Sequence, residues 1–393
     1  MSWPLVQASE LMLKRGGSVN PIKFPEETFE LFSIPAYDSD QPEILSGKDI
    51  GSSKSCIEPN DVLLSKIVPH IRRCWVVPDG KEYRQIGSGE WIIFRDERFY
   101  PQFLKHFLTS DCFHHQFMNT VAGVGGSLVR ARPAFVEKIQ IPLPPLDEQK
   151  RIAAILDKAN AIRRKRQQAI QLADDFLRSV FLDMFGDPIA NNKKWNIKEL
   201  GELAPNKGDM VDGPFGSSVN TKTDYIDDGE IPVIRTKNVS LSGEFITNDL
   251  KFMKREKYET IIRSNVVPGD IVLTKVGTIG NVCIFPPDFK EAVLSTTGSC
   301  RIRVEESCIN KTYLFYFLKY YRPKMHEIAS AGVQPFLNMK HIKGFKVPMP
   351  DKKLQEKFAD VVNRTRGSKA LLNESSKLKL FDSLSQKAFA GEL

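Results

Sequence analysis

The amino-acid sequence predicts an α+β protein in which two similar globular domains alternate with two long helices. Two observations support this prediction: an internal repeat, and a long run of helix-forming residues after each of two P-x-P motifs. The chain has 393 residues, of which 41% are hydrophobic and 26% are charged. It is therefore large enough for two or three domains that each bury a core.

The repeat keeps its register over much of each half of the chain. The segment PNDVLLSKI at 59–67 matches PGDIVLTKV at 268–276 with a shift of 209 residues, and IQIPLPP at 139–145 matches FKVPMPD at 345–351 with a shift of 206. Identical residues stand at equivalent positions of the two halves: Asp61 and Asp270, Lys66 and Lys275, Cys74 and Cys283, Gln149 and Gln355. We therefore expect the two halves to share one fold.

Each P-x-P motif precedes a predicted helix, the first at about 146–185 and the second at about 352–389. Apolar residues of the first helix alternate at spacings of three and four, which is a heptad seam: Ile152, Ile155, Ala159, Ile162, Ala169, Ala173, Phe176 and Val180. The second seam is weaker, with a polar gap near Thr365 and Ser368. We expect the helices to form an antiparallel intramolecular coiled coil about a pseudo-two-fold axis. The alternative is that each helix packs on its own domain or on another chain.

Short β-rich runs separated by Gly, Pro, Asn and Asp precede each long helix, and helical segments near 101–119 and 311–328 follow these runs. Both globular parts are therefore predicted to mix strands and helices. The expected organisation has four segments: a globular domain at 1–145, a central spacer helix at 146–190, a second domain at 191–350 and a distal spacer helix at 351–393.

Charge and missing motifs narrow the function. The net charge of +8 favours a polyanionic partner such as nucleic acid. The sequence has no G-x-x-x-x-G-K-[ST] loop, no metal-binding histidine spacing and no [DN]-P-P-[FYW] motif, so we expect a chain that is not an enzyme and holds no cofactor or metal. Six cysteines without a C-x-x-C pair are interpreted as reduced core residues. With no apolar run of membrane-spanning length and no signal-peptide pattern, a cytoplasmic location without membrane contact is expected.

Several segments resemble the DNA-specificity subunit of type I restriction-modification systems: IPLPPLDEQKRIAAILD (141–157), FLDMFGDP (181–188), GPFGSSV (213–219), IPVIRTKNV (231–239), PGDIVLTKVGTIGNV (268–282) and VPMPDKKLQEKFADVV (347–362). The resemblance implies two target-recognition domains, each reading half of a bipartite double-stranded DNA sequence, spaced by two antiparallel helices. It also implies two methyltransferase subunits that dock on these helices and supply S-adenosylmethionine and catalysis, and restriction subunits that join to cleave. The first domain departs further from the family pattern than the second does. Because the two domains differ in sequence, the expected target is asymmetric with a fixed gap.

Candidate DNA contacts are basic or amide side chains and glycine-rich loops, because Lys and Arg bind phosphates while Arg, Asn, Gln, Ser and Thr read base edges. The first-domain candidates are Lys66, His70, Arg72, Arg73, Gly125, Gly126, Ser127, Arg130 and Arg132. The second-domain candidates are Ser217, Ser218, Arg235, Lys237, Asn238, Lys275, Thr278, Gln334, Asn338 and Lys340. For each of them a structural or solvated surface role is the alternative, as it is for the run Arg163–Arg166 in the first helix.

Apolar residues near the helix ends exceed what one seam can bury, so we expect them to dock methyltransferase subunits: Leu146, Ile152, Ile155, Phe176, Phe181, Phe185 and Phe389. Two other functions remain open on the sequence alone. A stand-alone DNA-modifying or DNA-cleaving enzyme would need catalytic motifs that the sequence lacks. A coiled-coil scaffold that does not bind DNA would need neither the positive charge nor the duplicated domains.

Overall fold

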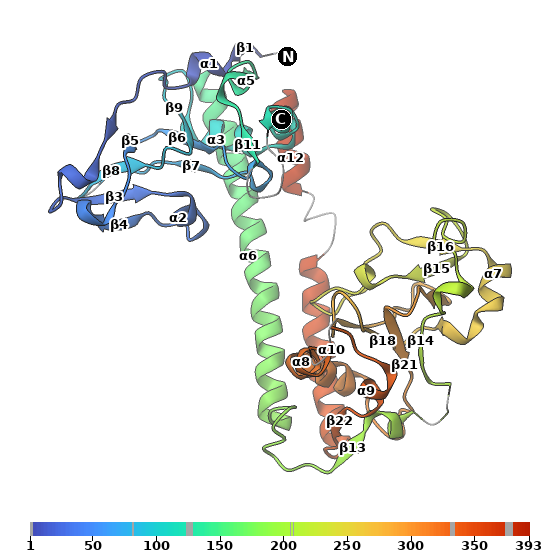
Figure 1. Cartoon of the computed structure of the whole chain (residues 1–393). Coiled ribbons are helices and arrows are strands. Elements are labelled where there is room, and N and C mark those ends of the chain that lie inside the picture. Colours follow the sequence, from blue (N-terminus) through green and yellow to red (C-terminus); the bar gives the residue numbers. More distant parts are fainter. Residues whose placement is uncertain are drawn as a thin grey trace. The chain divides into compact units, whose positions relative to one another are not determined.

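The computed structural model describes residues 3–80, 82–122, 129–204, 206, 208–330, 335–373 and 380–393, and of these the side chains of all except Ser217 and 368–373. The chain divides into two compact units. The first unit comprises Met1–Gln168 and Asn373–Leu393, and the second comprises Ala169–Leu372. The boundary falls inside the long helix α6 (Leu146–Phe185), which therefore contributes its first part to one unit and its last part to the other (Figure 1).

The described part of the first unit contains twelve strands and the shorter helices that surround them. In chain order its strands and α-helices are β1 (Leu5–Gln7), α1 (Ala8–Leu11), β2 (Ser18–Val19), β3 (Thr28–Phe32), α2 (Ile34–Asp38), β4 (Glu43–Ser46), β5 (Lys54–Cys56), β6 (Val62–Ser65), β7 (Cys74–Val76), β8 (Arg84–Gly87), β9 (Trp91–Phe94), α3 (Pro101–Thr109), α4 (Asp111–Met118), β10 (Val121–Ala122), β11 (Arg130–Ala131), α5 (Pro133–Val136), β12 (Gln140–Pro142), the first part of α6, and α12 (Leu380–Ala390).

The second unit has a similar order of elements. They are the last part of α6, β13 (Ile197–Glu199), β14 (Met210–Asp212), β15 (Ile231–Ile234), β16 (Lys251–Met253), α7 (Arg255–Thr260), β17 (Asn265–Val266), β18 (Ile271–Thr274), β19 (Val282–Ile284), β20 (Ala292–Leu294), β21 (Ser299–Ile302), α8 (Lys311–Ala329), α9 (Met339–Lys343), β22 (Lys346–Pro348) and α10 (Lys352–Asn373).

Sheet topology confirms the repeat that the sequence predicts, but not the equivalence of Cys74 with Cys283. Cys74 pairs with Leu64 and Cys283 with Val272, so the two sulfurs lie one register position apart and face different cores. The antiparallel sheet β7-β6-β9 of the first unit has its counterpart in β19-β18-β21 of the second, to which β14 adds a further strand. Each unit also contains a parallel pair, formed by β3 with β8 and by β15 with β20. The first and last strands of each domain pair as well, β1 with β12 and β13 with β22. The predicted α+β class, with two similar domains and a long helix between them in the chain, is confirmed.

The central strand of each domain is buried on both faces, which explains its apolar sequence. Val62 and Leu64 of β6 face a core formed with α3 and α4, while Leu63 faces a second core on the other side of the sheet. In the second domain Ile271 and Leu273 of β18 face the core that includes α8, and Val272 faces the opposite one. Alternation of side chains along a strand therefore serves two cores in each domain.

Within each unit, α6 lies antiparallel to a C-terminal helix. Near the end of α6, the ring of Phe181 packs on that of Phe358, close to the start of α10, with ring centroids 5.5 Å apart. Near the start of α6, Arg151 donates a hydrogen bond of 2.8 Å to the carbonyl of Leu393, beyond the end of α12. Each end of α6 thus meets the opposite end of its partner helix, as predicted for an antiparallel pair.

Two details of the predicted seam are wrong. Phe176 is 51% exposed, whereas its neighbour Leu177 is buried, and Ile162 is exposed as well. A straight helix has 3.6 residues per turn and drifts away from a strict heptad repeat, so the seam extrapolated to Phe176 misses the buried face by one position. At Ile162 the residues on both sides are exposed as well, so the helix has no buried face there. The predicted second helix is described as α10 and α12, and the residues at 374–379 lie outside the described part of the chain.

Among the described helices, none has a stretch long and apolar enough to span a membrane.

Candidate nucleic-acid interface

Lys66 and Arg130 of the first domain gather around one acidic residue. Lys66 follows strand β6; its Nζ donates to the carbonyl of Gly89 at 2.6 Å and lies 3.9 Å from Glu90. Arg130, on β11, pairs with the other carboxylate oxygen of Glu90 at 3.2 Å. All three side chains keep contact with solvent. The pair of cations around one anion leaves a net positive charge at the end of the sheet.

His70, Arg72 and Arg73 lie in the connection between β6 and β7, and Arg132 follows β11. Arg72 pairs with Asp111 at 2.6 Å, and Arg73 makes a bidentate pair with Asp38 that lowers the pKa of this carboxyl through the two hydrogen bonds. The guanidinium of Arg132 lies 4.0 Å from the centroid of the Phe135 ring. His70 is exposed, while the candidates Gly125, Gly126 and Ser127 lie outside the described residues.

Lys275, in the second domain, was expected to be an exposed contact, and the structure corrects this. Its side chain is only 6% exposed, and its Nζ pairs with Asp212 at 3.1 Å. Its backbone N–H donates to Gly298 at 2.7 Å, and its carbonyl accepts from the N–H of Leu337 at 3.0 Å. Lys275 therefore holds three segments together: the end of β14, the loop before β21 and the loop before α9.

Asn238 is the second correction among the candidates, because it is fully buried. Its side-chain oxygen accepts from the N–H of Arg235 at 3.0 Å, and its amide donates to the carbonyl of Ile246 at 2.9 Å. It fixes the turn that presents its neighbours. Lys237 and Arg235 both interact with Asp249 from this turn, and the side chain of Lys237 is half exposed.

Ser218, Thr278, Asn338 and Lys340 lie on or beside the segments that Lys275 joins. Ser218, Thr278 and Lys340 are exposed. Asn338 is partly buried and caps α9, since its side-chain oxygen accepts from the N–H of His341 at 2.8 Å. The candidate Gln334 lies outside the described residues, as does the side chain of Ser217.

Sequence reasoning missed two features of these loops. Lys14 and Arg15 are exposed beside a glycine pair in the first domain, and Lys14 lines a groove of about 550 Å³ together with Lys66. In the second domain Phe215 and Phe336 are 64% and 48% exposed within loops that meet at Lys275. Exposed aromatics next to glycine and polar residues were visible in GPFGSSV, but only the structure shows that distant loops bring them together.

Cysteine thiols and possible metal ligands are scattered among the described residues. Within the described ranges, no group of three or more His, Cys, Asp or Glu side chains could hold a metal ion. Burial raises the pKa of the Cys74, Cys283 and Cys300 thiols to about 12, so these sulfurs stay protonated near neutral pH. The interpretation of every cysteine as a core residue is wrong for Cys112 and Cys308, which are exposed.

The docking candidates divide by burial. The structure corrects three of them, Ile152, Phe181 and Phe185, which are buried in cores of this chain and offer no free surface. The remaining four differ in exposure: Leu146 and Phe176 are exposed, whereas Ile155 and Phe389 are partly buried. Phe389 packs on Phe103 and Phe107 of its own domain, with ring centroids 5.8 and 5.3 Å apart.

Comparisons with known proteins point to one family. A family model described as the type I restriction modification DNA specificity domain matches residues 91–172 and 192–377. The MjaVIII specificity subunit of Methanocaldococcus jannaschii is 24% identical over 237 residues, 57% of this chain and 54% of that protein. The StySPI specificity subunit of Salmonella potsdam is 24% identical over 321 residues, 76% of this chain and 67% of that protein. The match thus spans about half the length of the archaeal relative.

A solved structure supports the fold. The type I restriction-modification S subunit from M. genitalium aligns with a TM-score of 0.60 at 16% identity, covering 99% of this chain and 96% of that one. The family model alone covers more than half of the chain and includes parts of both domains. This chain belongs to the family of DNA-specificity subunits of type I restriction-modification systems.

Proposed function

We propose that this chain is the sequence-specific DNA-binding subunit of a type I restriction-modification enzyme, and that each domain reads one half of an asymmetric bipartite target. In each domain several loops meet at a lysine, Lys66 in the first and Lys275 in the second, and we call this place the loop junction. The loop junction is the observation that carries the proposal. Its backbone hydrogen bonds are the same in both domains, whereas the side chains that it presents differ. Similar frames with different side chains suit the recognition of two different half-sites.

Affinity for the duplex comes from the exposed cations of these loops, and specificity from polar side chains that reach base edges. In the first domain we assign these roles to Lys66, His70, Arg72, Arg73, Arg130, Arg132 and the segment Gly125, Gly126 and Ser127. In the second we assign them to Ser217, Ser218, Arg235, Lys237, Thr278, Gln334, Asn338 and Lys340. Lys275 and Asn238 are buried and hold these loops in place.

Methylation and cleavage belong to partner subunits in this proposal. Two methyltransferase subunits bring S-adenosylmethionine and dock on apolar side chains that the chain leaves exposed, such as Leu146 and Phe176 on α6. Leu172, one turn before Phe176 on the same face, is 68% exposed and extends this surface. Restriction subunits join the assembly to cleave, and the complex works in the cytoplasm.

The helix α6 sets the gap between the two half-sites. It has 40 residues and contributes to both units, and at ~1.5 Å per residue it is roughly 60 Å long. One turn of DNA spans ~34–36 Å. A rod of this length suits two half-sites whose centres lie more than one turn apart.

Methyl transfer by the purified chain, alone and with two methyltransferase subunits, tests the proposal. Labelled S-adenosylmethionine and genomic DNA are the substrates. The chain alone should transfer no label, and the complex should methylate one bipartite sequence. Transfer by the chain alone, or methylation by the complex without sequence preference, would contradict the proposed role.

A further inference from the structure

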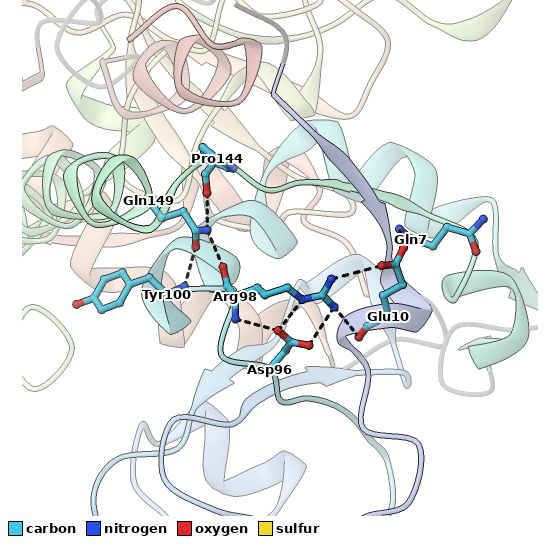
Figure 2. Close-up of polar contacts among 7 residues, drawn as sticks. All are labelled: Gln7, Glu10, Asp96, Arg98, Tyr100, Pro144 and Gln149. Atoms are coloured by element: carbon cyan, nitrogen blue, oxygen red, sulfur yellow. Dashed lines mark hydrogen bonds and ion pairs between the residues drawn. The ribbon is translucent and has the colours of Figure 1, made fainter.

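A buried glutamine joins the first turn of α6 to the first domain. The side chain of Gln149 is fully buried, and its amide donates to the carbonyls of Pro144 at 2.8 Å and Arg98 at 2.9 Å. Its side-chain oxygen accepts from the backbone N–H of Tyr100 at 2.7 Å. Figure 2 shows these three bonds converging on one side chain. Tyr100 is the N-cap residue of α3, so Gln149 connects the starts of two helices.

The second unit repeats this connection with its own residues. Gln355 is 1% exposed and lies in the first turn of α10. Its amide donates to the carbonyl of Pro350 at 2.8 Å, and its oxygen accepts from the N–H of Asn310 at 2.9 Å. Asn310 is the N-cap residue of α8, the helix equivalent to α3. Two of the three hydrogen bonds of Gln149, those to the proline carbonyl and to the N-cap N–H, thus recur at Gln355, 206 residues later in the chain.

These bonds differ from ordinary core packing in what they connect. Each glutamine satisfies a backbone N–H at the N-terminus of the main domain helix, which otherwise would lack an intrahelical partner. At the same time it binds the carbonyl of the proline that precedes its own spacer helix. Apolar contacts between a helix and a domain tolerate small rotations, whereas hydrogen bonds have strict distances and angles. The glutamine therefore fixes the orientation of the helix on the domain.

We propose that Gln149 and Gln355 are positioning residues that fix how each recognition domain is attached to its spacer helix, and thereby hold the gap of the DNA target at one length. This inference rests on the proposed function, because it needs a bipartite target. The glutamines do not touch the DNA in this scheme. They act by preventing the domain from turning on the helix to reach a half-site that is one base pair nearer or farther.

A residue beside Gln149 supplies a matched control. Arg98 contributes its carbonyl to Gln149, but its side chain points the other way and binds Asp96 at 2.9 Å and Glu10 at 3.4 Å (Figure 2). Arg98→Ala therefore removes ion pairs beside the junction while leaving the backbone carbonyl that Gln149 uses. It should change stability slightly and leave the gap unchanged.

The experiment uses the full chain assembled with its methyltransferase subunits. Gln149→Met keeps the length of the side chain and loses its hydrogen bonds, and Gln149→Glu keeps the acceptor for Tyr100 while placing a carboxylate against two carbonyls. Gln355→Met is the equivalent change in the second unit. Each complex methylates a library of duplexes in which the two half-sites are constant and the gap varies by up to two base pairs. Unfolding in urea is measured for every variant.

The parent should prefer one gap strongly. In the glutamine variants, the preference over gaps one base pair shorter or longer should fall by about tenfold, because buried hydrogen bonds no longer resist the rotation. The half-site sequences should stay the same, and Arg98→Ala should retain the parental preference. A role in stability alone would lower the unfolding midpoint and leave the gap preference intact.

Two outcomes overturn the inference. One is a folded glutamine variant whose gap preference equals that of the parent. The other is a variant that no longer unfolds cooperatively, which would assign the glutamine to the folding of the domain and not to its attachment. A parent complex that methylates no bipartite sequence contradicts the proposed function instead, so the two failures can be told apart.

Discussion

The loop junctions of the two domains share a backbone frame and differ in their side chains. In the first domain the N–H of Lys66 donates to Glu90 at 3.1 Å, and its carbonyl accepts from Ala131 at 2.8 Å. In the second, Lys275 makes the corresponding bonds to Gly298 and Leu337 at 2.7 and 3.0 Å. The frame is thus the same although the two sequences have diverged.

The lysine side chains have opposite surroundings. Lys275 is buried against Asp212, whereas Lys66 is partly exposed and shares Glu90 with Arg130. The bridge of Met12 with Phe94 corresponds to the pair of Met210 with Ile302, which places Lys14 where the second domain has Asp212. A carboxylate at this position binds Lys275, whereas the Nζ of Lys66 binds the carbonyl of Gly89 and Glu90 instead and keeps contact with solvent. One position therefore decides whether the lysine supports the loops or faces the solvent.

The largest expected effect comes from a feature that both domains share. Asp61 accepts from the N–H of Glu58 at 2.8 Å and from Arg95 at 2.6 and 2.7 Å, and Asp270 does the same with Val267 and Arg303 at 2.8, 2.7 and 2.7 Å. Asp61→Ala and Asp270→Ala should each destabilise their own domain by about 3 kcal/mol, because a buried carboxylate that binds a backbone N–H and an arginine is lost. The loss should be somewhat smaller for Asp61→Ala, since Arg95 keeps its second ion pair, with Glu58 at 2.6 Å. Urea unfolding followed by circular dichroism measures both. Strongly unequal losses would show that the frame is not shared.

The lysines should separate the two domains. Lys275→Ala leaves Asp212 without its cation inside the junction, and should cost about 1–3 kcal/mol in the second unit. Lys66→Ala removes a partly exposed cation, and should cost less than about 1 kcal/mol. The same unfolding measurement compares them. Equal costs would contradict the structural role assigned to Lys275.

The contact between domain helix and spacer helix should depend on pH in the first unit and not in the second. His106 of α3 is buried and binds Asp157 of α6 at 2.8 Å, while the equivalent position in α8 is Tyr316. Burial lowers the pKa of His106, opposed by Asp157 and assisted by the charge of Lys105. The folded state thus prefers the neutral ring. Its contribution to stability is complete above the ordinary pKa of about 6.5 and is lost as the pH falls from there through the lowered value.

The first unit should therefore lose stability below about pH 6.5, and His106→Gln should reduce this loss. Unfolding midpoints measured between pH 5 and pH 8, with a fluorescent label in each unit, test this. An equal loss in both units, or an unchanged pH profile in the His106→Gln chain, would refute the assignment.

The smallest effect should come from converting the first junction into the second. Lys14→Asp supplies the carboxylate that Asp212 provides in the second domain, and should draw Lys66 into an ion pair. Binding of duplex DNA should weaken a few-fold, with a salt dependence lower by about 1–2 in slope, because one or two phosphate contacts are lost. Fluorescence anisotropy at several salt concentrations measures both quantities, and Lys14→Ala separates the loss of one cation from the capture of the other. Unchanged affinity would remove Lys14 and Lys66 from the interface.

The sequence was sufficient for the features that local patterns determine. The repeat, the long helices and the shared Asp61 and Asp270 follow from residues that keep their spacing. It was not sufficient for partners distant in the chain, such as Asp212, which lies 63 residues from Lys275 and determines its burial. Asn238 was misjudged for a related reason, because an amide in a polar turn looks the same whether it caps the turn or projects from it. Phe176 and Leu177 differ by one position, which a seam extrapolated along a helix cannot resolve.

The most direct measurement of the central claim changes the spacer and leaves both domains untouched. Inserting four helix-forming residues after Gln168 adds roughly 6 Å and little more than one helical turn to α6, while DNA advances ~3.4 Å per base pair. Methylated sites are mapped genome-wide for the parent and for the insertion variant. Both half-site sequences should be unchanged and the gap should lengthen by one or two base pairs. An active variant with the parental gap, or with altered half-sites, would contradict the account of two independent domains on a helical spacer.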